Sequence, residues 1–182
     1  MANRNQNTRS DFDKTDNLVI ENAEIIFRNF RGIDRGYNPK HEKSFSLLIK
    51  PERFEVESMK ADGWNLKPLK QREGYEDEPV NYHLPVTVRF DNFPPRIYLV
   101  TKVSSEGEKP RYRKTLLDEE SAFMIDTAEI ANVNVEISHG RTYEFNGKVG
   151  IKAYLKTMYI ELVEDRFDEL YDFVDDDEES PF

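Results

Sequence analysis

The charge of this chain is concentrated at its C-terminal end. Residues 164–182 hold ten acidic side chains and one basic one, so this segment carries a formal −9 of the whole chain's −10. The five consecutive acids of residues 175–179 repel one another and favour solvent over a packed interior. The fold must therefore come from the rest of the chain, whose net charge is close to zero. A neutral body can hold a local basic groove for an anionic partner. The acidic tail would repel that partner or occupy the groove in its absence.

The two ends of the chain bound the part that can fold. Residues 1–16 are rich in Asn, Asp, Arg and Thr, which predicts a flexible N-terminal arm. Residues 17–163 are enough for one domain with a single core. Apolar residues at helical spacing predict a short amphipathic helix over 164–174, and residues 175–182 form the acidic tail.

The composition excludes several classes of protein. The chain has no cysteine, which rules out disulfides, thiolate zinc sites and cysteine nucleophiles and is compatible with a reducing cytosol. No apolar run approaches the roughly 18 residues of a transmembrane helix, and the N-terminus lacks the apolar core of a secretory signal. We therefore expect a cytoplasmic protein with no membrane partner.

Short runs in which apolar and polar side chains alternate dominate the body, and such runs predict strands. They cover residues 18–30, 45–50, 82–90, 96–103, 133–137 and 149–163, with a helix predicted over 51–62 and one or two more between 116 and 130. Residues 104–114 are predicted to be a charged loop. Pro85 favours an edge strand or a strand start, His139-Gly140 predicts a turn, and Asn146-Gly147 predicts a tight hairpin turn.

This pattern predicts a mainly β fold with short helices. A five-stranded OB-fold-like β-barrel with insertions fits the length and the number of strands. The number of strands alone does not select it over another β-barrel.

The strand predicted over 149–163 carries the most specific pattern of the body. Its alternation places Lys152, Tyr154 and Lys156 on one face, and Ile151, Ala153, Leu155 and Tyr159 on a core face. Single-stranded nucleic acid binds to such a row, because lysines follow the phosphates while the ring stacks on a base for about 1–3 kcal/mol. A solvated strand face with a packed tyrosine explains the row equally well.

Basic and aromatic residues recur together elsewhere in the body. These clusters add the candidate DNA contacts Arg28, Phe30, Arg31, Arg35, Tyr37, Lys43, Trp64, Lys67, Arg96, Tyr98, Arg111, Arg113 and Lys148. The candidates for base stacking are Phe30, Tyr37, Trp64 and Tyr154. Each cluster also fits a solvated face beside a core aromatic, and Trp64 in particular is of a type that is more often core than ligand.

Signals for catalysis are weak. His41, His83 and His139 lack metal-ligand spacing, and the chain has neither a phosphate-binding loop nor a nucleophile elbow. The acidic pairs Glu119-Glu120 and Asp126/Glu129 fit helix starts better than a magnesium site. We expect a non-enzymatic protein without metal or cofactor, with a metal-dependent nuclease as a distant alternative.

The C-terminal tip has the chemistry of a docking peptide. A proline-stiffened phenylalanine with a free carboxylate suits an apolar pocket flanked by basic residues. The expected docking residues are Asp175, Asp176, Asp177, Glu178, Glu179, Pro181 and Phe182. The alternative is a tail that only improves solubility.

The tail resembles that of bacterial and phage single-stranded DNA-binding proteins, which end in an acidic stretch closed by an aromatic residue. The body resembles a family of tailed-phage single-stranded DNA-binding proteins with an OB-fold. The matching segments include NFRG (29–32), DGWNLK (62–67), IYLVT (97–101) and NGKVGIKAYL (146–155). The chain departs from the family over residues 138–145, where the family has an Arg-Pro-Tyr-rich turn with a tryptophan.

The resemblance implies sequence-independent binding of single-stranded DNA during phage DNA replication, recombination or repair in the cytoplasm of a bacterial host. It also implies that the tail recruits replication and recombination proteins and competes with DNA for the groove. The alternative from another class is an acidic-tailed protein-interaction adaptor that binds no nucleic acid. A homodimer, through an edge strand near Pro85 or through the C-terminal helix, is also left open.

Overall fold

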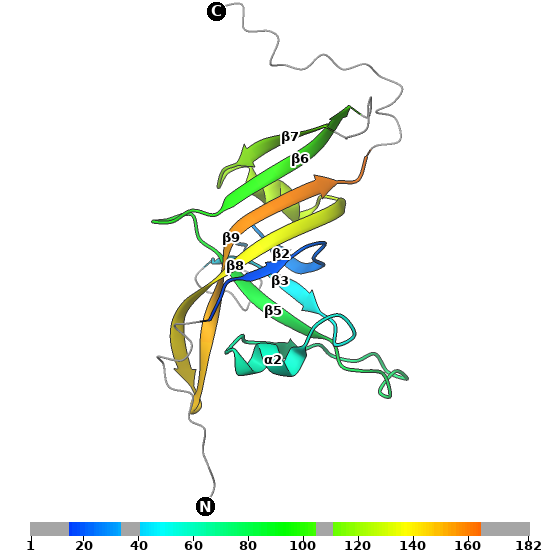
Figure 1. Ribbon diagram of the computed structural model, residues 1–182, viewed down its shortest axis with the longest axis vertical. Coiled ribbons are helices and arrows are strands. Elements are labelled where there is room, and N and C mark those ends of the chain that lie inside the picture. Colours follow the sequence, from blue (N-terminus) through cyan, green and yellow to red (C-terminus); the bar gives the residue numbers. More distant parts are fainter. Residues whose placement is uncertain (1–14, 34–40, 105–110, 165–182) are drawn as a thin grey trace, which may run out of the picture.

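The computed structural model of the protein describes residues 15–33, 41–104 and 111–164 (Figure 1). This part is mainly β, which confirms the predicted class. Its helices are α2 (Val56–Ala61) and the short 3-10 helix η1 (Ala122–Asp126). Its strands are β1 (Leu18–Ile20), β2 (Ile25–Asn29), β3 (Lys43–Ile49), β4 (Lys67–Pro68), β5 (Tyr82–Val88), β6 (Arg96–Ser104), β7 (Arg111–Leu117), β8 (Ile130–Phe145) and β9 (Lys148–Leu162).

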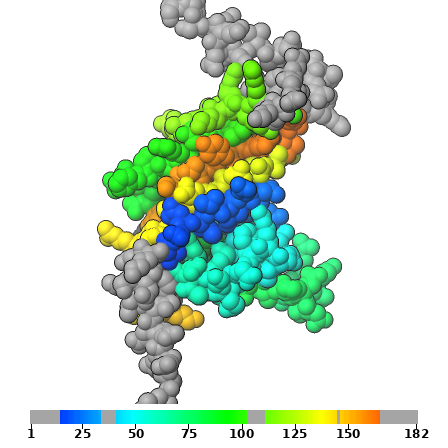
Figure 2. Space-filling view, in the orientation of Figure 1, coloured from blue at the N-terminus to red at the C-terminus, as the bar shows by residue number. Residues whose placement is uncertain are grey.

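Strand β9 is the centre of the sheet. The strand order is β1-β8-β9-β5-β3-β2, with β4 added to β5 and the β6–β7 hairpin added to β9. One edge of β9 pairs antiparallel with β8 along its whole length. The other edge pairs in parallel, first with β5 at Ala153 and Tyr154 and then with β6 from Thr157 to Glu161. Figure 2 shows β6–β7 (green), the C-terminal half of β9 (orange) and β8 (yellow) side by side.

The two ends of this strand order belong to one segment of chain. Strands β1 and β2 are separated only by residues 21–24. The amide of Ala23 donates to the carbonyl of Val133 on β8 at 2.7 Å, and the amide of Leu48 on β3 donates to the carbonyl of Glu24 at 2.9 Å. In the described residues, the nine-stranded sheet nevertheless has an open path of six strands from β1 to β2, with β4, β6 and β7 off it, so the pairings do not reproduce the predicted closed, five-stranded barrel.

The long β8–β9 hairpin turns at Asn146-Gly147, as predicted. Both residues have positive φ, 50° and 75°, which an Asn-Gly turn accommodates. The turn predicted at His139-Gly140 is wrong, because β8 continues through it. A register shift between His139 and Thr142 marks a bulge there, so Gly140 serves a bulge rather than a chain reversal.

Other boundaries also differ from the prediction. The predicted strand 18–30 is interrupted at residues 21–24, and the helix is confined to α2 because residues 51–54 form turns. The predicted loop 104–114 contains the start of β7, whose exposed charged residues hide the strand pattern. Pro85 lies in the middle of β5, between the pairings of that strand with β4 and with β9, rather than at an edge or strand start.

The core lies under one face of β9. Every second residue, Ile151, Ala153 and Leu155, is buried. The alternation then shifts by one residue, so that Met158 and Ile160 are the next buried positions. The shift coincides with a bulge, because Glu136 pairs with Thr157 while Ile137 pairs with Leu155, which leaves Lys156 as an extra residue. Tyr159 therefore lies half-buried on the outer face, and its predicted place in the core is wrong.

Candidate nucleic-acid interface

The outer face of β9 presents a ring between two lysines. Lys152 and Lys156 are exposed and Tyr154 is half-buried, while the residues between them point into the core. This confirms the predicted division of faces for residues 151–156, although not for Tyr159. The Tyr154 ring lies against Gly140 of β8, and the ammonium of Lys152 is 5.5 Å from the ring centroid. The neighbouring strand therefore supports the ring from one side.

Three adjoining recesses form a groove along this face. The first, about 670 Å³, lies between β9 and the 89–96 turn. The second, about 610 Å³, shares Arg89 with the first, and the third, about 540 Å³, shares Lys152 with the second and Tyr154 with the first. We call this surface the β9 groove; its charged and aromatic lining comprises Glu42, Lys43, Lys67, Arg89, Phe90, Asp91, Phe93, Arg96, Glu119, Arg141, Tyr143, Lys152, Tyr154 and Lys156.

The groove has a net positive lining. Seven of its side chains are basic and three are acidic, so it favours an anionic ligand although the protein as a whole is acidic. Its rings, on Phe90, Phe93, Tyr143 and Tyr154, alternate with these bases. A polyanion with flat apolar groups is the ligand that such a surface suits.

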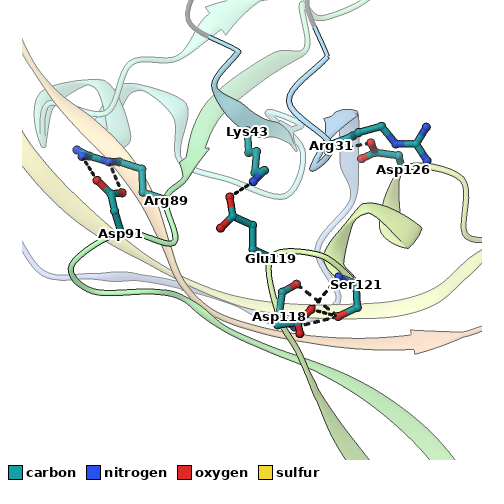
Figure 3. Close-up of polar contacts among 8 residues, drawn as sticks. All are labelled: Arg31, Lys43, Arg89, Asp91, Asp118, Glu119, Ser121 and Asp126. Carbon is teal, nitrogen blue, oxygen red and sulfur yellow. Dashed lines mark hydrogen bonds and ion pairs between the residues drawn. The ribbon is translucent and has the colours of Figure 1, made fainter.

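Carboxylates already hold several cations of the groove. Lys43 pairs with Glu119, and the guanidinium of Arg89 pairs with Asp91 at 2.8 Å (Figure 3). Lys152 lies 3.0 Å from Glu42. The pair between Lys156 and Glu136 of β8 spans 3.4 Å, just beyond the groove.

The ionisation of these groups follows from their partners. The hydrogen bond from Arg89 holds the pKa of Asp91 below its usual range. The pKa of Glu136 is lowered first by the hydrogen bond from Asn17 and then by Lys156. Both acids are charged at neutral pH. Exposed ion pairs of this kind contribute about 0–1 kcal/mol, so a phosphate can replace the carboxylate at little cost.

Two predicted stacking residues are core residues instead. Phe30 is 0% exposed and stacks on Phe45 at 5.4 Å between centroids. Trp64 is 4% exposed, and its backbone bridges to Ile151 beneath the groove. Neither ring can reach a base while the core stays intact, so the structure corrects both assignments.

Arg28 and Arg31 do not line the groove. The guanidinium of Arg28 donates to the carbonyls of Ile125 and Ala128, both at 2.8 Å, and so fixes β2 to the end of η1. Its predicted DNA contact is therefore replaced by a structural role. Arg31 is exposed, with its guanidinium 4.8 Å from the centroid of the Phe123 ring. Its backbone amide donates to Asp126 at 3.2 Å (Figure 3).

The remaining predicted contacts divide into three groups. Lys43, Lys67, Arg96, Lys152, Tyr154 and Lys156 meet at or beside the groove. Tyr98 lies farther along β6, Arg111 and Arg113 lie on β7, and Lys148 lies beside the hairpin turn. Arg35, Tyr37 and the docking residues of the tail, Asp175 to Glu179 with Pro181 and Phe182, lie outside the described residues, as does the helix predicted over 164–174.

Five basic or aromatic residues of the groove were not predicted from the sequence: Arg89, Phe90, Phe93, Arg141 and Tyr143. Phe93 is 92% exposed, in a turn between Asn92 and Pro94 that no strand covers. A phenylalanine inside an Asn-Phe-Pro-Pro turn was the available signal, because such a turn has no buried face. The Tyr143 hydroxyl would lie 2.8 Å from a Cβ at Gly150, and partial burial raises the pKa of this tyrosine.

The histidines and acids of the described residues form no metal centre. The Nδ1 atom of His83 is 2.9 Å from the hydroxyl of Ser46, which occupies that ring nitrogen. Within residues 15–33, 41–104 and 111–164, no group of three His, Asp or Glu side chains could hold a metal ion. No helix in the same ranges is long and apolar enough to cross a membrane.

Comparisons with known proteins point to one class. A family model described as "Putative phage ssDNA-binding domain" matches residues 7–180. A comparison with curated proteins finds no match.

Among solved structures, the chain is similar to the single-stranded DNA-binding protein from bacteriophage Enc34. One structure of the Enc34 protein matches at 15% identity and a TM-score of 0.45, over 91% of each chain. Its complex with ssDNA matches at 10% identity and a TM-score of 0.49, over 85% of this chain and 90% of that one. A C-terminal truncation of it matches at 12% identity and a TM-score of 0.47, over 84% and 89%.

Proposed function

Since the chain belongs to the family of phage single-stranded DNA-binding domains, we propose that it binds single-stranded DNA in the β9 groove without sequence preference. The observation that carries the proposal is the row of Lys152, Tyr154 and Lys156 on the outer face of β9. Every base has a flat face, so stacking on Tyr154 does not distinguish bases, and lysines attract phosphates of any sequence.

The turn before β6 completes the binding surface. Phe93 of this turn lines the first recess of the groove together with Arg89, Arg96 and Tyr154. We propose that a base lies between or over these rings while the arginines hold the neighbouring phosphates. The high exposure of Phe93 supports this role, because burying the ring against a base removes apolar surface from water.

DNA binding in this groove is an exchange of anions. Phosphates replace Glu42 on Lys152, Asp91 on Arg89 and Glu119 on Lys43. The carboxylates keep these side chains extended over the groove in the absence of DNA. The exchange makes each contact weaker than a new ion pair would be, because the pair within the protein must break first.

We infer that the sheet is an OB-like barrel that the β1–β2 segment closes. The hydrogen bonds of Ala23 and Glu24 to β8 and β3 support this inference. OB-folds bind oligonucleotides on the face of their central strands. The outer sides of β3 and β5 adjoin the β9 groove through Ser44 and Thr87, in agreement with such a face.

We further propose that the protein serves phage DNA replication, recombination or repair, and that residues 175–182 recruit partner proteins and compete with DNA. The opposite charges of the tail and the groove support the competition. Removal of residues 175–182 then leaves DNA affinity equal or higher and abolishes partner docking. A clear loss of DNA affinity on truncation contradicts this part.

The test is a titration of labelled oligo-dT by fluorescence anisotropy at several salt concentrations. Replacing Lys152 and Lys156 together by Gln weakens binding and lowers the slope of log K against log salt by about 1.4, at about 0.7 per phosphate contact. The matched control replaces Lys60 and Lys70, which do not line the groove, and leaves the slope unchanged. No binding by the full chain at low salt contradicts the proposal and favours a protein-interaction adaptor.

A further inference from the structure

A second cluster of rings and bases lies beyond the groove, where β6 joins β9. Tyr98 of β6 and Tyr159 of β9 are register partners, with ring centroids 5.0 Å apart and planes at 38°. The ammonium of Lys114 on β7 is 4.5 Å from the Tyr98 centroid and 5.8 Å from that of Tyr159. With Tyr112 of β7, we call these residues the β6–β9 platform.

The platform lies on the same side of β9 as Tyr154. The bulge at Lys156 moves the buried positions from Leu155 to Met158, so the outer positions continue from Tyr154 to Tyr159. Tyr159 is five positions after Tyr154 along the strand, a distance of about 16 Å at about 3.3 Å per residue. The aromatic row of the groove therefore continues along the same strand.

Basic residues connect the two surfaces. Arg96 lines the groove beside Lys156, and it stands two positions before Tyr98, on the same face of β6. A further recess of about 260 Å³ lies past Tyr159, where Tyr112 and Asn134 also contribute to the walls. The track from Lys152 to Tyr112 thus carries several bases and rings, with the acid Glu161 at the far recess: Lys152, Tyr154, Lys156, Arg96, Tyr98, Tyr159 and Tyr112.

The outer face of β7 is left uncovered by the described residues. Tyr112 is 51% exposed and Leu116 is 60% exposed, and Lys114 lies between them on the same face. The role of the Tyr98–Tyr159 pair in holding β6 on β9 does not account for Tyr112 and Lys114. Tyr112 lies outside that pair and is half exposed, and Lys114 is an exposed side chain whose ammonium lies over the two rings.

We propose that the β6–β9 platform is a second stacking subsite, over which single-stranded DNA runs after it leaves the β9 groove. This inference rests on the proposed function. It adds the path that the DNA takes beyond the groove and a second set of contacts. Bases stack on Tyr159, Tyr98 and Tyr112, while Arg96 and Lys114 contact phosphates. The continuity with the basic groove selects DNA rather than another protein as the occupant.

The proposal predicts an effect that depends on the length of the DNA. We would compare an oligo-dT of about 6 nucleotides, confined to the groove, with one of about 20 that reaches the platform. Lys114→Gln lowers the salt slope of the long oligonucleotide by about 0.7 and leaves that of the short one unchanged. Tyr159→Leu keeps apolar bulk but removes the flat ring, and it lowers the affinity for the long oligonucleotide by about tenfold.

The matched control is Thr115→Glu. It changes the charge by the same single unit at the neighbouring position of β7, whose side chain points to the opposite face. This variant lowers the affinity for the long oligonucleotide less than Lys114→Gln does and leaves its salt slope unchanged. Equal effects of the two variants would mean that net charge alone explains the change in affinity, and this would overturn the proposal.

The outcomes separate this inference from the proposed function. Tyr154→Ala could lower the affinity for both oligonucleotides while Lys114→Gln and Tyr159→Leu lower it for neither. In that case the groove binds DNA and the platform does not. If no oligonucleotide binds the full chain, the proposed function itself fails. If the platform variants change the mass in sedimentation and leave DNA affinity unchanged, the surface joins copies of this chain and the proposal is overturned.

Discussion

The ring of Tyr154 on β9 occupies the space that a side chain at Gly140 on β8 would take. A Cβ at position 140 would stand 2.1 Å from the Cε2 atom of the ring and 2.6 Å from Cδ2. The bulge of β8 and the absence of a side chain at Gly140 together let the ring lie over the neighbouring strand. The orientation of the proposed stacking residue is therefore set by a glycine on a different strand.

Gly140→Ala should weaken DNA binding. The added methyl group displaces the Tyr154 ring, so part of the stacking energy of about 1–3 kcal/mol is lost. The measurement is the anisotropy of labelled oligo-dT in four forms: the unchanged chain, Gly140→Ala, Tyr154→Ala and both together. Gly140→Ala should have no further effect once Tyr154 is Ala, and losses that simply add would show that Gly140 does not act through the ring.

Glu42→Gln should strengthen DNA binding. The change removes the carboxylate that pairs with Lys152 at 3.0 Å, so a phosphate no longer has to displace it. Since exposed pairs contribute up to about 1 kcal/mol, affinity at low salt should rise by up to about fivefold.

The matched control for Glu42 is Glu57→Gln, which frees Lys60 on α2 outside the groove. Both variants raise the net charge by one. An equal rise in DNA affinity for both would mean that total charge, and not the exchange of anions on Lys152, sets the affinity.

Phe93→Ala should lower DNA affinity and leave stability unchanged. The ring is 92% exposed, so its removal opens no cavity in the core. Thermal unfolding and oligo-dT titration measured on the same sample separate the two effects. Tyr75→Ala, which removes another exposed ring outside the groove, should change neither property; unaltered DNA affinity in Phe93→Ala would exclude this ring from the interface.

The stability of the fold should depend on the protonation of His83. Burial, followed by the charge of Lys67, lowers the pKa of His83 from its ordinary value of 6.5. The unfolded chain therefore binds this proton at a higher pH than the folded chain does. Stability is complete above about pH 6.5 and decreases as the pH falls, until folded His83 is protonated as well.

The measurement is the melting temperature of the unchanged chain and of His83→Asn between pH 5 and 7.5. Asn keeps a polar atom near Nδ1 for Ser46 but does not titrate. The unchanged chain should lose more stability than the variant across this range. Parallel curves would show that His83 does not contribute to the pH dependence.

The sequence predicted features that depend on local patterns. The alternation along β9 placed Lys152, Tyr154 and Lys156 on the outer face, and Asn146-Gly147 gave the hairpin turn. Both follow from the backbone geometry of a few consecutive residues. The assignment of Tyr159 to the core failed because a bulge is not visible in an alternating pattern.

The sequence did not predict features that depend on distant contacts. Phe30 and Trp64 stand next to bases in the sequence, as a stacking residue would, but β3 and β9 bury them. The pair of Lys152 with Glu42 joins residues 110 positions apart, and that of Lys43 with Glu119 joins residues 76 apart. Phe93 was not predicted because a residue in a turn between two strands shows no alternation that would assign it to a face.

The most direct measurement of the central claim is the DNA affinity of Tyr154→Phe and Tyr154→Ala for oligo-dT, oligo-dA and oligo-dC, together with the melting temperature of each form. Stacking on a flat ring predicts that Phe retains the affinity and that Ala lowers it by about tenfold or more for all three sequences. If the folded Ala variant binds as tightly as the unchanged chain, Tyr154 does not stack on DNA and the proposed interface on β9 is wrong.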